Sequence, residues 1–419
     1  MLYYQKGDNN MDVLIKNIIV KNNRISADVY VNQEKNEVWY EFPWNMENIT
    51  TFPANAFLVA FMPIAMRFGG KIEIEGEISQ SLYNQMQTYQ DIMTKWYSEL
   101  THIEIYAKKI SNDIISNNKR KTISCFTGGV DAFYTLIKNQ EKINTLLYVW
   151  GFDIPLVEEA FFSQVQSHLS AVAKSFKKEI IFVKTNLGFE VTNKYASWGD
   201  YCYGSAIASV ILFMTNKYEL CLMPSCNDYS VLVPRGSHVL INHLWSCNGV
   251  KFVYDGAEAS RIEKVDKISD NELVKNHLRV CYKSNDIYNC CECEKCIRTM
   301  SSLEAVNKLD KVKTFHKPLI LQNIGKIKLS NYSELKFAEA TRSFALKNNK
   351  TELAEQLNQQ IVDYNSRNIL QYLNENFDTL LNNKDFFDFS RRITDWHIEH
   401  NTKYTAKKLT KEIGKKILK

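Results

Sequence analysis

Apolar and polar residues alternate with a period of two near the start of the chain. The alternation is clearest over residues 25–31 and 38–42, and short polar stretches separate these runs. A period of two is typical of strands with one buried face, so the pattern predicts a β-meander between about residues 14 and 42.

The next apolar segments predict helices as well as a strand. Residues 56–68 form a nearly continuous apolar run, and the apolar residues between Leu82 and Trp96 have helical spacing. A strand is predicted at Lys71–Glu75, between the two helices. Together with the meander, these elements predict a small α+β domain over residues 1–115.

After a polar stretch at Ser111–Lys121, predicted strands alternate with segments of helical length. The strands are Thr122–Phe126, Thr145–Trp150, Ile180–Lys184 and Glu219–Met223, and the helices lie near 131–140, 157–176 and 202–217. Alternation of this kind predicts an α/β fold, in which helices cover both faces of a parallel sheet. We expect this domain to span residues 116–325, and a polar, helical extension to span 326–419.

Composition and charge favour a folded cytoplasmic protein. Of the 419 residues 45% are hydrophobic, and the net charge is only +5. Seven lysines and one glutamate lie between Lys403 and Lys419, but Leu409, Ile413 and Ile417 there favour an amphipathic helix over a nucleic-acid-binding tail. No secretory signal is recognisable, and no apolar run reaches the ~20 residues that a bilayer requires. We therefore expect no membrane partner, and contact with nucleic acid stays open.

The most informative segment of the first half follows the predicted strand Thr122–Phe126. It reads Thr127-Gly128-Gly129-Val130-Asp131-Ala132 and leads at once into a helix. Paired glycines let the backbone approach a ligand, and the N–H groups of a helix N-terminus attract phosphate. Asp131 would lie where a carboxylate can hold Mg²⁺ beside phosphate oxygens. The alternative is a plain strand-to-helix turn with Asp131 as the N-cap.

Four cysteines predict a metal site. Cys281, Cys290, Cys293 and Cys296 have the spacing C-x8-C-x2-C-x2-C. Such short gaps let thiolates converge on one ion, and four thiolates complete a tetrahedral, structural Zn²⁺ site. Free thiols or redox pairs are the alternative. Cys291, a fifth cysteine in this segment, has no predicted role.

Together these features resemble one family, the 7-cyano-7-deazaguanine synthases, which are PP-loop ATP pyrophosphatases. Residues 127–132 are similar to the family's S-G-G-x-D-S loop, although Ala132 lacks the last hydroxyl. Asp228-Tyr229-Ser230 is similar to the family's D-Y-S segment beside the substrate, and Lys264 takes the place of a lysine at a helix start. The cysteine spacing completes the resemblance, which covers about residues 120–310.

The resemblance implies a fold, ligands and an activity. The fold would be a PP-loop domain of the HUP, or adenine nucleotide alpha hydrolase-like, class. The loop at 127–132 would bind ATP and Mg²⁺, with Asp131 and Lys264 as catalytic residues. A carboxylate or amide oxygen of the substrate would receive AMP, pyrophosphate would leave, and ammonia or another amine would then displace AMP. Such a ligase would act on a deazaguanine-like small molecule or on a macromolecular acceptor.

The chain also departs from the family. Residues 231–238 read Val-Leu-Val-Pro-Arg-Gly-Ser-His where the family has a Y-P-D-C-R run, and both terminal regions are additional. Asp228, Arg235 and His238 are predicted to bind the substrate, and for Arg235 and His238 the alternative is an ordinary surface loop. In its size the chain is similar to enlarged synthase-like proteins of bacterial anti-phage gene clusters, which implies protein partners from such a cluster.

Two other functions stay open. A PP-loop ligase or thiolase that modifies tRNA would need basic patches with interleaved aromatic residues near the site, and only the end of the chain is basic. A non-catalytic, zinc-containing scaffold would be consistent with the missing hydroxyl at Ala132.

Overall fold

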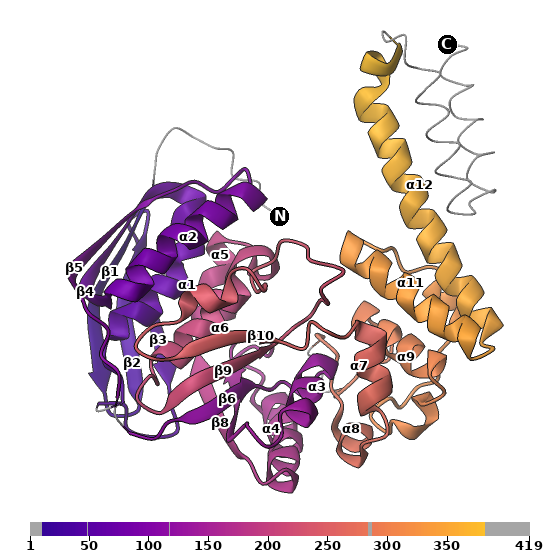
Figure 1. Cartoon of the computed structure of the whole chain (residues 1–419), viewed down its shortest axis with the longest axis horizontal. Coiled ribbons are helices and arrows are strands. Elements are labelled where there is room, and N and C mark those ends of the chain that lie inside the picture. Colours follow the sequence, from indigo (N-terminus) through magenta and orange to yellow (C-terminus); the bar gives the residue numbers. More distant parts are fainter. Residues whose placement is uncertain (1–10, 48, 117, 284–286, 382–419) are drawn as a thin grey trace. The chain divides into compact units, whose positions relative to one another are not determined.

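One large sheet dominates the first part of the chain. The computed structural model describes residues 11–47, 49–116, 118–283 and 287–381. Within them, ten strands form one mostly parallel sheet in the order β10-β9-β6-β7-β8-β3-β2-β1-β4-β5 (Figure 1). The chain divides into two compact units, Met1–Cys296 with Lys311–His316 and Ile297–Asp310 with Lys317–Lys419. The predicted α/β fold is confirmed, and the sheet belongs to the first unit.

The N-terminal strands form the predicted meander. They are β1 (Met11–Lys21), β2 (Arg24–Val31) and β3 (Glu34–Glu41), and they pair antiparallel in sequence order. Tight turns join them, where Asn22 (φ 52°) and Asn32 (φ 48°) adopt the left-handed conformation that asparagine tolerates. Every second residue of β2 is buried, which is the alternation that predicted the strand.

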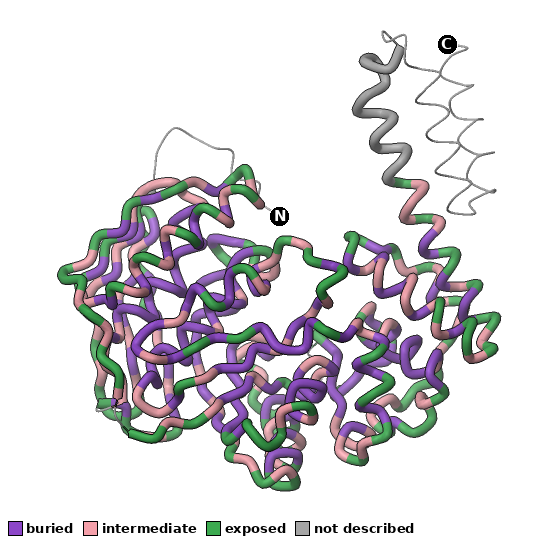
Figure 2. Tube along the Cα trace, in the orientation of Figure 1, coloured by how far each residue is buried: buried purple, intermediate pink, exposed green. Residues whose placement is uncertain are grey.

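Two helices and two strands complete the N-terminal part of the sheet. They are α1 (Pro53–Phe68), β4 (Gly69–Ser79), α2 (Gln80–Trp96) and β5 (Glu104–Ser111). The predicted helices and strand are confirmed. β5 was not predicted, because Ile105 is its only buried residue and no alternation results. α1 is buried on nearly all sides, between the sheet and α6 (Figure 2).

The parallel part of the sheet follows the predicted rhythm. Its elements are β6 (Lys121–Cys125), α3 (Val130–Lys138), β7 (Thr145–Trp150), α4 (Glu159–Ser175), β8 (Glu179–Thr185), α6 (Tyr203–Leu212), β9 (Tyr218–Pro224) and β10 (Lys251–Asp255). All four predicted strands and the three helices between them are confirmed, and β10 is an addition. Each neighbouring pair from β10 to β8 is parallel.

Helices cover both faces of the parallel strands, as predicted. α3 and α4 connect neighbouring strands in one direction, whereas α6 leads from β8 back across the sheet to β9 (Figure 1). Because such crossovers are right-handed, α6 lies on the face opposite to α3 and α4. On the α4 face, Phe162 packs against Tyr148 and Phe182. On the other face, α6 packs against α1.

The sheet continues across the predicted domain boundary at residue 115. β3 pairs antiparallel with β8 through Tyr40 and Thr185, and the Thr185 hydroxyl donates to Trp39 O at 2.6 Å. The Asn186 side chain extends this pairing, since it donates to Glu37 O at 2.8 Å and accepts from Trp39 N at 3.0 Å. The structure thus joins two segments that the sequence pattern separates, because strand pairing between distant residues leaves no local signal.

Shorter elements surround the sheet. They are α5 (Asn193–Tyr195), α7 (Arg261–Ile268), α8 (Glu272–His277), π-helical turns at Leu187–Thr192 and Trp198–Cys202, and a 3-10 turn at Asn242–Trp245. None of the helices in the described part of the chain combines the length and the hydrophobicity that crossing a membrane demands.

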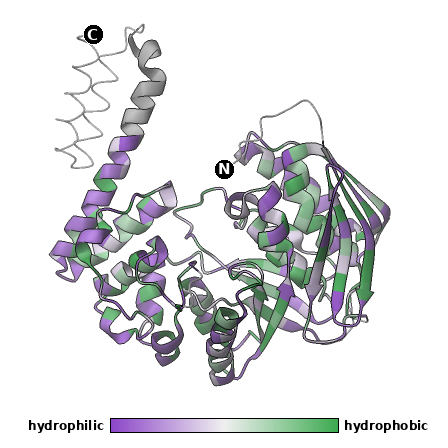
Figure 3. Cartoon of the chain, turned by 180° about the vertical axis from the view of Figure 1, so that it is seen from behind, coloured by the Kyte–Doolittle hydropathy of each residue, from purple (hydrophilic) through white to green (hydrophobic). Residues whose placement is uncertain are grey.

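The second unit is helical, as predicted for the C-terminal extension. The elements from this end of the chain are α9 (Glu294–Ala305), a 3-10 turn at Leu309–Lys311, α10 (Leu321–Ile324), α11 (Tyr332–Lys347) and α12 (Thr351–Leu381). α11 packs against α12, along whose described residues hydrophilic side chains predominate (Figure 3). This unit comprises Ile297–Asp310 and Lys317–Lys419, and the extension predicted from residue 326 lies within it. The helix predicted around Leu409–Ile417 lies outside the described residues.

Candidate functional site

The candidate site lies where β6 and β9 end. The chain passes from β6 to β7 and β8 on one side and returns to β9 on the other, so the strand order reverses between β6 and β9. Open α/β sheets bind ligands at the carboxyl ends of strands beside such a reversal. The loop at 127–132 follows β6, and Ser225 and Cys226 follow β9.

The loop after β6 requires glycine at one of its two glycine positions. Gly128 has φ +76°, and a Cβ there would lie 3.0 Å from a methyl carbon of Leu169. Gly128 O also accepts from Arg279 N at 2.8 Å, which ties the loop to the segment after α8. Gly129 has φ −80°, and a Cβ there would meet no atom closer than 3.6 Å. Gly128 therefore sets the shape of the loop.

The alternative that Asp131 caps α3 is wrong. Gly129 occupies the N-cap position, and no side chain accepts a hydrogen bond there. Asp131 lies within the first turn of α3 and is turned toward α7. The N-terminal end of α3 thus keeps its positive dipole end free of a side-chain cap, next to the exposed Thr127.

Two cations hold Asp131. Arg261 donates from NH1 to Oδ2 at 2.5 Å, and Lys264 donates from Nζ to Oδ1 at 3.2 Å. Lys264 also donates to the carbonyl oxygen of Ser225 at 2.7 Å and to its Oγ at 2.9 Å. The Lys264 side chain is 1% exposed and that of Asp131 20% exposed. Burial raises the pKa of Asp131, but the charges of Arg261 and Lys264 outweigh this and keep it below its usual value.

Local sequence explains why both cations face Asp131. Ser260 and Glu263 form a capping box, in which Ser260 N donates to Glu263 Oε2 at 2.8 Å. The box fixes the first turn of α7. Arg261 and Lys264 are three residues apart, so they lie on the same side of this helix.

A second ion pair, in which only the arginine is buried, supports the loop. Arg279 donates from NH1 to Asp153 Oδ2 at 2.6 Å, and Tyr148 OH donates to Asp153 Oδ1 at 2.6 Å. Burial lowers the pKa of Arg279, yet Asp153 and its neighbours raise it overall. Because Arg279 N also bonds Gly128 O, this pair fixes the backbone that covers the loop.

The three predicted substrate residues have different surroundings. Asp228 is partly buried and closes a turn, since its Oδ1 accepts from Ser230 N at 2.8 Å. His238 is 3% exposed, so the surface-loop alternative is wrong for it. Its Nδ1 accepts from Leu240 N at 3.1 Å, whereas its buried Nε2 has no partner within the described residues. Burial lowers the pKa of His238.

Arg235 is partly buried and has no ion pair with an acidic side chain of the described residues within 4 Å. Its pKa is raised, chiefly by the negative charge that Cys226 carries when ionised and then by Tyr203 and Tyr254, against the opposing effect of burial. An unpaired guanidinium among such groups is suited to hold an anion.

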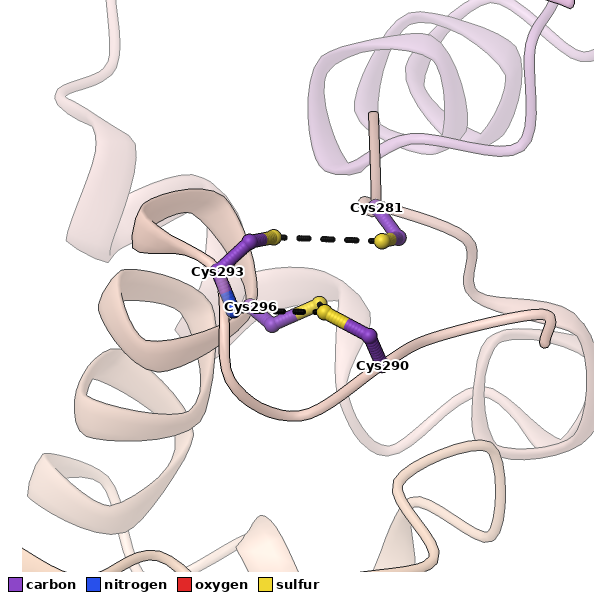
Figure 4. Close-up of side chains that lie close together, drawn as sticks. All are labelled: Cys281, Cys290, Cys293 and Cys296. Atoms are coloured by element: carbon purple, nitrogen blue, oxygen red, sulfur yellow. Dashed lines mark hydrogen bonds between the residues drawn. The ribbon is translucent and has the colours of Figure 1, made fainter. Parts of the chain in front are cut away.

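The four predicted cysteine ligands converge (Figure 4). Cys281 and Cys293 have sulfurs 3.8 Å apart, and Cys290 and Cys296 have sulfurs 3.9 Å apart. In a tetrahedron with metal–sulfur bonds of about 2.3 Å, neighbouring sulfurs are about 3.8 Å apart. The N–H groups of Glu292 and Cys293 donate to the Cys290 sulfur at 3.4 and 3.2 Å. This cluster can hold a metal ion such as zinc.

Cys291 does not join the cluster. Its backbone has φ +61°, and its sulfur lies 3.7 Å from His316 Nδ1. The left-handed backbone turns this side chain away from the other four, which explains why the fifth cysteine has no place in the tetrahedron.

Sequence reasoning missed several residues at this end of the sheet. Arg261 could have been found from its position three residues before Lys264. Ser225, Tyr203 and Tyr254 carry no such signal, because only the folded sheet brings the ends of β9 and β10 to the start of α6.

Searches with the sequence and the structure find no match to a family model, a curated protein or a solved structure. The resemblance to the 7-cyano-7-deazaguanine synthases therefore rests on the motifs of the chain itself.

Proposed function

We propose that the chain is an ATP-dependent adenylating ligase of the 7-cyano-7-deazaguanine synthase type. The observation that carries this proposal is the cluster of Asp131, Arg261 and the buried Lys264 beside the uncapped end of α3. Two cations and one carboxylate leave a net positive charge next to free N–H groups, and this combination favours a polyphosphate.

We infer a role for each residue from its contacts. The N–H groups at the start of α3 would hold the leaving pyrophosphate, and Arg261 would neutralise its charge. The Nε–H of Arg261 is buried without a partner within the described residues, and an entering phosphate oxygen would satisfy it. Both oxygens of Asp131 already accept from cations, so Asp131 would position Arg261 and Lys264, and binding of Mg²⁺ by Asp131 would require these contacts to rearrange.

Lys264 would stabilise the charge that develops on the α-phosphate. Its three donors are all used in the present geometry, by Asp131 and twice by Ser225. A phosphate oxygen would replace one of these acceptors. Arg235 would bind an anionic, deazaguanine-like substrate, and the four cysteines would hold a structural Zn²⁺ that cross-links the segment after α8.

The experiment follows AMP and pyrophosphate formation from ATP, Mg²⁺, ammonia and 7-carboxy-7-deazaguanine. Lys264→Ala is expected to reduce the rate about 100-fold or more, as loss of one preorganised charge contact does. Arg261→Gln, at a less buried position, provides a second variant, and Lys267→Ala on the exposed face of α7 is the matched control. Wild-type protein that forms no AMP, with small substrate or with a macromolecular acceptor, would contradict the proposal.

A non-catalytic scaffold is the second candidate, and one observation favours it. Asp131 is already neutralised by Arg261 and Lys264, as expected of a structural ion pair. Calorimetry with ATP and Mg²⁺ separates the two functions, because a scaffold of this kind would bind no nucleotide.

A further inference from the structure

A second polar cluster surrounds Cys226, the residue that follows Ser225. Ser225 binds Lys264 through its carbonyl and its hydroxyl, and Cys226 is the next residue. Consecutive Cα atoms are about 3.8 Å apart, so the backbone that carries the Cys226 side chain directly follows the residue that binds Lys264. Cys226 is partly exposed and forms no disulfide.

Two phenols flank the Cys226 sulfur. Tyr254 OH lies 3.7 Å and Tyr203 OH 3.8 Å from Sγ. The Tyr254 oxygen already accepts from Asn227 N at 3.3 Å, so its own hydrogen is available to the sulfur. A phenol that donates to sulfur stabilises the thiolate over the thiol.

The residues that follow Cys226 in the chain supply a cation and two unpartnered polar atoms. Arg235 has no ion pair with an acidic side chain of the described residues within 4 Å, and Cys226 is the largest cause of its raised pKa. Asn227 and His238 are at most 3% exposed. Their atoms Oδ1 and Nε2, respectively, have no hydrogen-bond partner within the described residues. Buried polar atoms without partners are costly, and a bound polar ligand would satisfy them. Partly exposed thiols beside cations are the reactive ones.

We propose that Cys226 is a nucleophile that takes the acyl group from the adenylate and holds it as a thioester. This inference rests on the proposed function. The thiolate sulfur forms a bond to the carbonyl carbon, the bond from that carbon to the AMP oxygen breaks, and AMP leaves with the electron pair. An amine then attacks the thioester carbon and loses a proton to solvent, and the carbon–sulfur bond breaks to regenerate the Cys226 thiolate. The acyl group thus stays on the protein while the amine enters.

The first test needs no substrate. Wild-type, zinc-containing protein is treated with iodoacetamide at pH 7, and the modified peptides are quantified by mass spectrometry. Cys226 is expected to react at least about tenfold faster than Cys125, the partly exposed cysteine at the end of β6, because two phenol oxygens lie within 3.8 Å of its sulfur. Arg235→Met should bring the two rates together. Equal rates in the wild type would overturn the inference.

The second test looks for the thioester. After reaction with ATP, Mg²⁺ and 7-carboxy-7-deazaguanine and an acid quench, the intact protein should gain the mass of the substrate minus water, and hydroxylamine should remove it. Cys226→Ser should show no such adduct and lose turnover by about 100-fold or more, with unchanged thermal melting and zinc content. Pyrophosphate release without an adduct, with Cys226→Ser as active as the wild type, overturns the inference alone. No pyrophosphate release from the wild type refutes the adenylation proposal instead, and the labelling ratio still decides whether Cys226 is a nucleophile.

Discussion

The N-terminal half of the sheet (β1–β5) and the parallel half (β6–β10) differ in how far their ion pairs are buried. Along β1–β5 the ion pairs are exposed, as between Arg24 and Glu37, whose side chains are 38% and 60% exposed. At the ends of β6 and β9 the Lys264 ammonium is almost completely buried and meets Asp131. Exposed pairs add little free energy, whereas a buried pair pays a desolvation cost that apolar residues would avoid. The buried charge thus lies in the parallel half of the sheet, where the proposed adenylation would take place, whereas the N-terminal half carries its ion pairs at solvent-facing side chains.

Removing a bound metal should give the largest difference in stability between the two halves. Structural zinc binds with about 10–16 kcal/mol in small zinc domains, so chelation should greatly reduce protection from hydrogen exchange after α8 and leave β1–β5 unchanged. Cys293→Ser should lose the zinc. Cys291→Ser, next to a ligand but outside the tetrahedron, should keep about one ion per chain, as measured by metal analysis.

A cavity in the core beside the N-terminal strands should have the opposite effect, because it should lower the free energy of unfolding and leave the zinc in place. Phe57 is fully buried and packs against Tyr40 and Phe213. Phe57→Ala should lower the free energy of unfolding by about 3–5 kcal/mol in urea titrations. The same change at Phe189, which is 41% exposed, should cost less than about 0.5 kcal/mol. Loss of zinc from Phe57→Ala at temperatures where it stays folded would argue against a metal site whose stability is independent of this core.

The two loop glycines should respond unequally. Gly128→Ala should destabilise the protein by about 1–2 kcal/mol, because an L-residue is strained at φ +76° and its Cβ would press on Leu169. Gly129→Ala should leave the free energy of unfolding nearly unchanged. A similar loss for both variants would show that the loop differs from this description.

The smallest effect should appear only in acid. The pKa of Asp131 is lowered in the folded chain, so its contribution to stability is present above the unfolded pKa of about 3.9 and is lost as the pH falls through the lower native value. The difference in unfolding free energy between wild type and Asp131→Asn should therefore be constant near neutrality and shrink below about pH 4. Asp266→Asn, on the exposed face of α7, should show no such change.

Much of the fold and part of the site could be predicted from the sequence. Strands with regular alternation and the cysteine spacing are local patterns, and both are confirmed. β5 and the joining of β3 to β8 were missed, because one has no alternation and the other depends on residues about 145 positions apart. At the site, the loop and Lys264 were identified, but the partners that hold them, Arg261 and Ser225, are defined by tertiary contacts. The Cys226 cluster draws on three separate segments, and none of them is unusual alone.

The pairing of β3 with β8 has a practical consequence for the isolation of the parallel half of the sheet. A fragment starting at residue 116 would leave β8 as an open edge, with its backbone N–H and C=O groups along Lys184 and Thr185 unsatisfied. Such edges recruit strands from other molecules. The fragment would also uncover the apolar surface of α6 that α1 covers. Shortening the gene at that point should therefore yield insoluble aggregates rather than a soluble fragment.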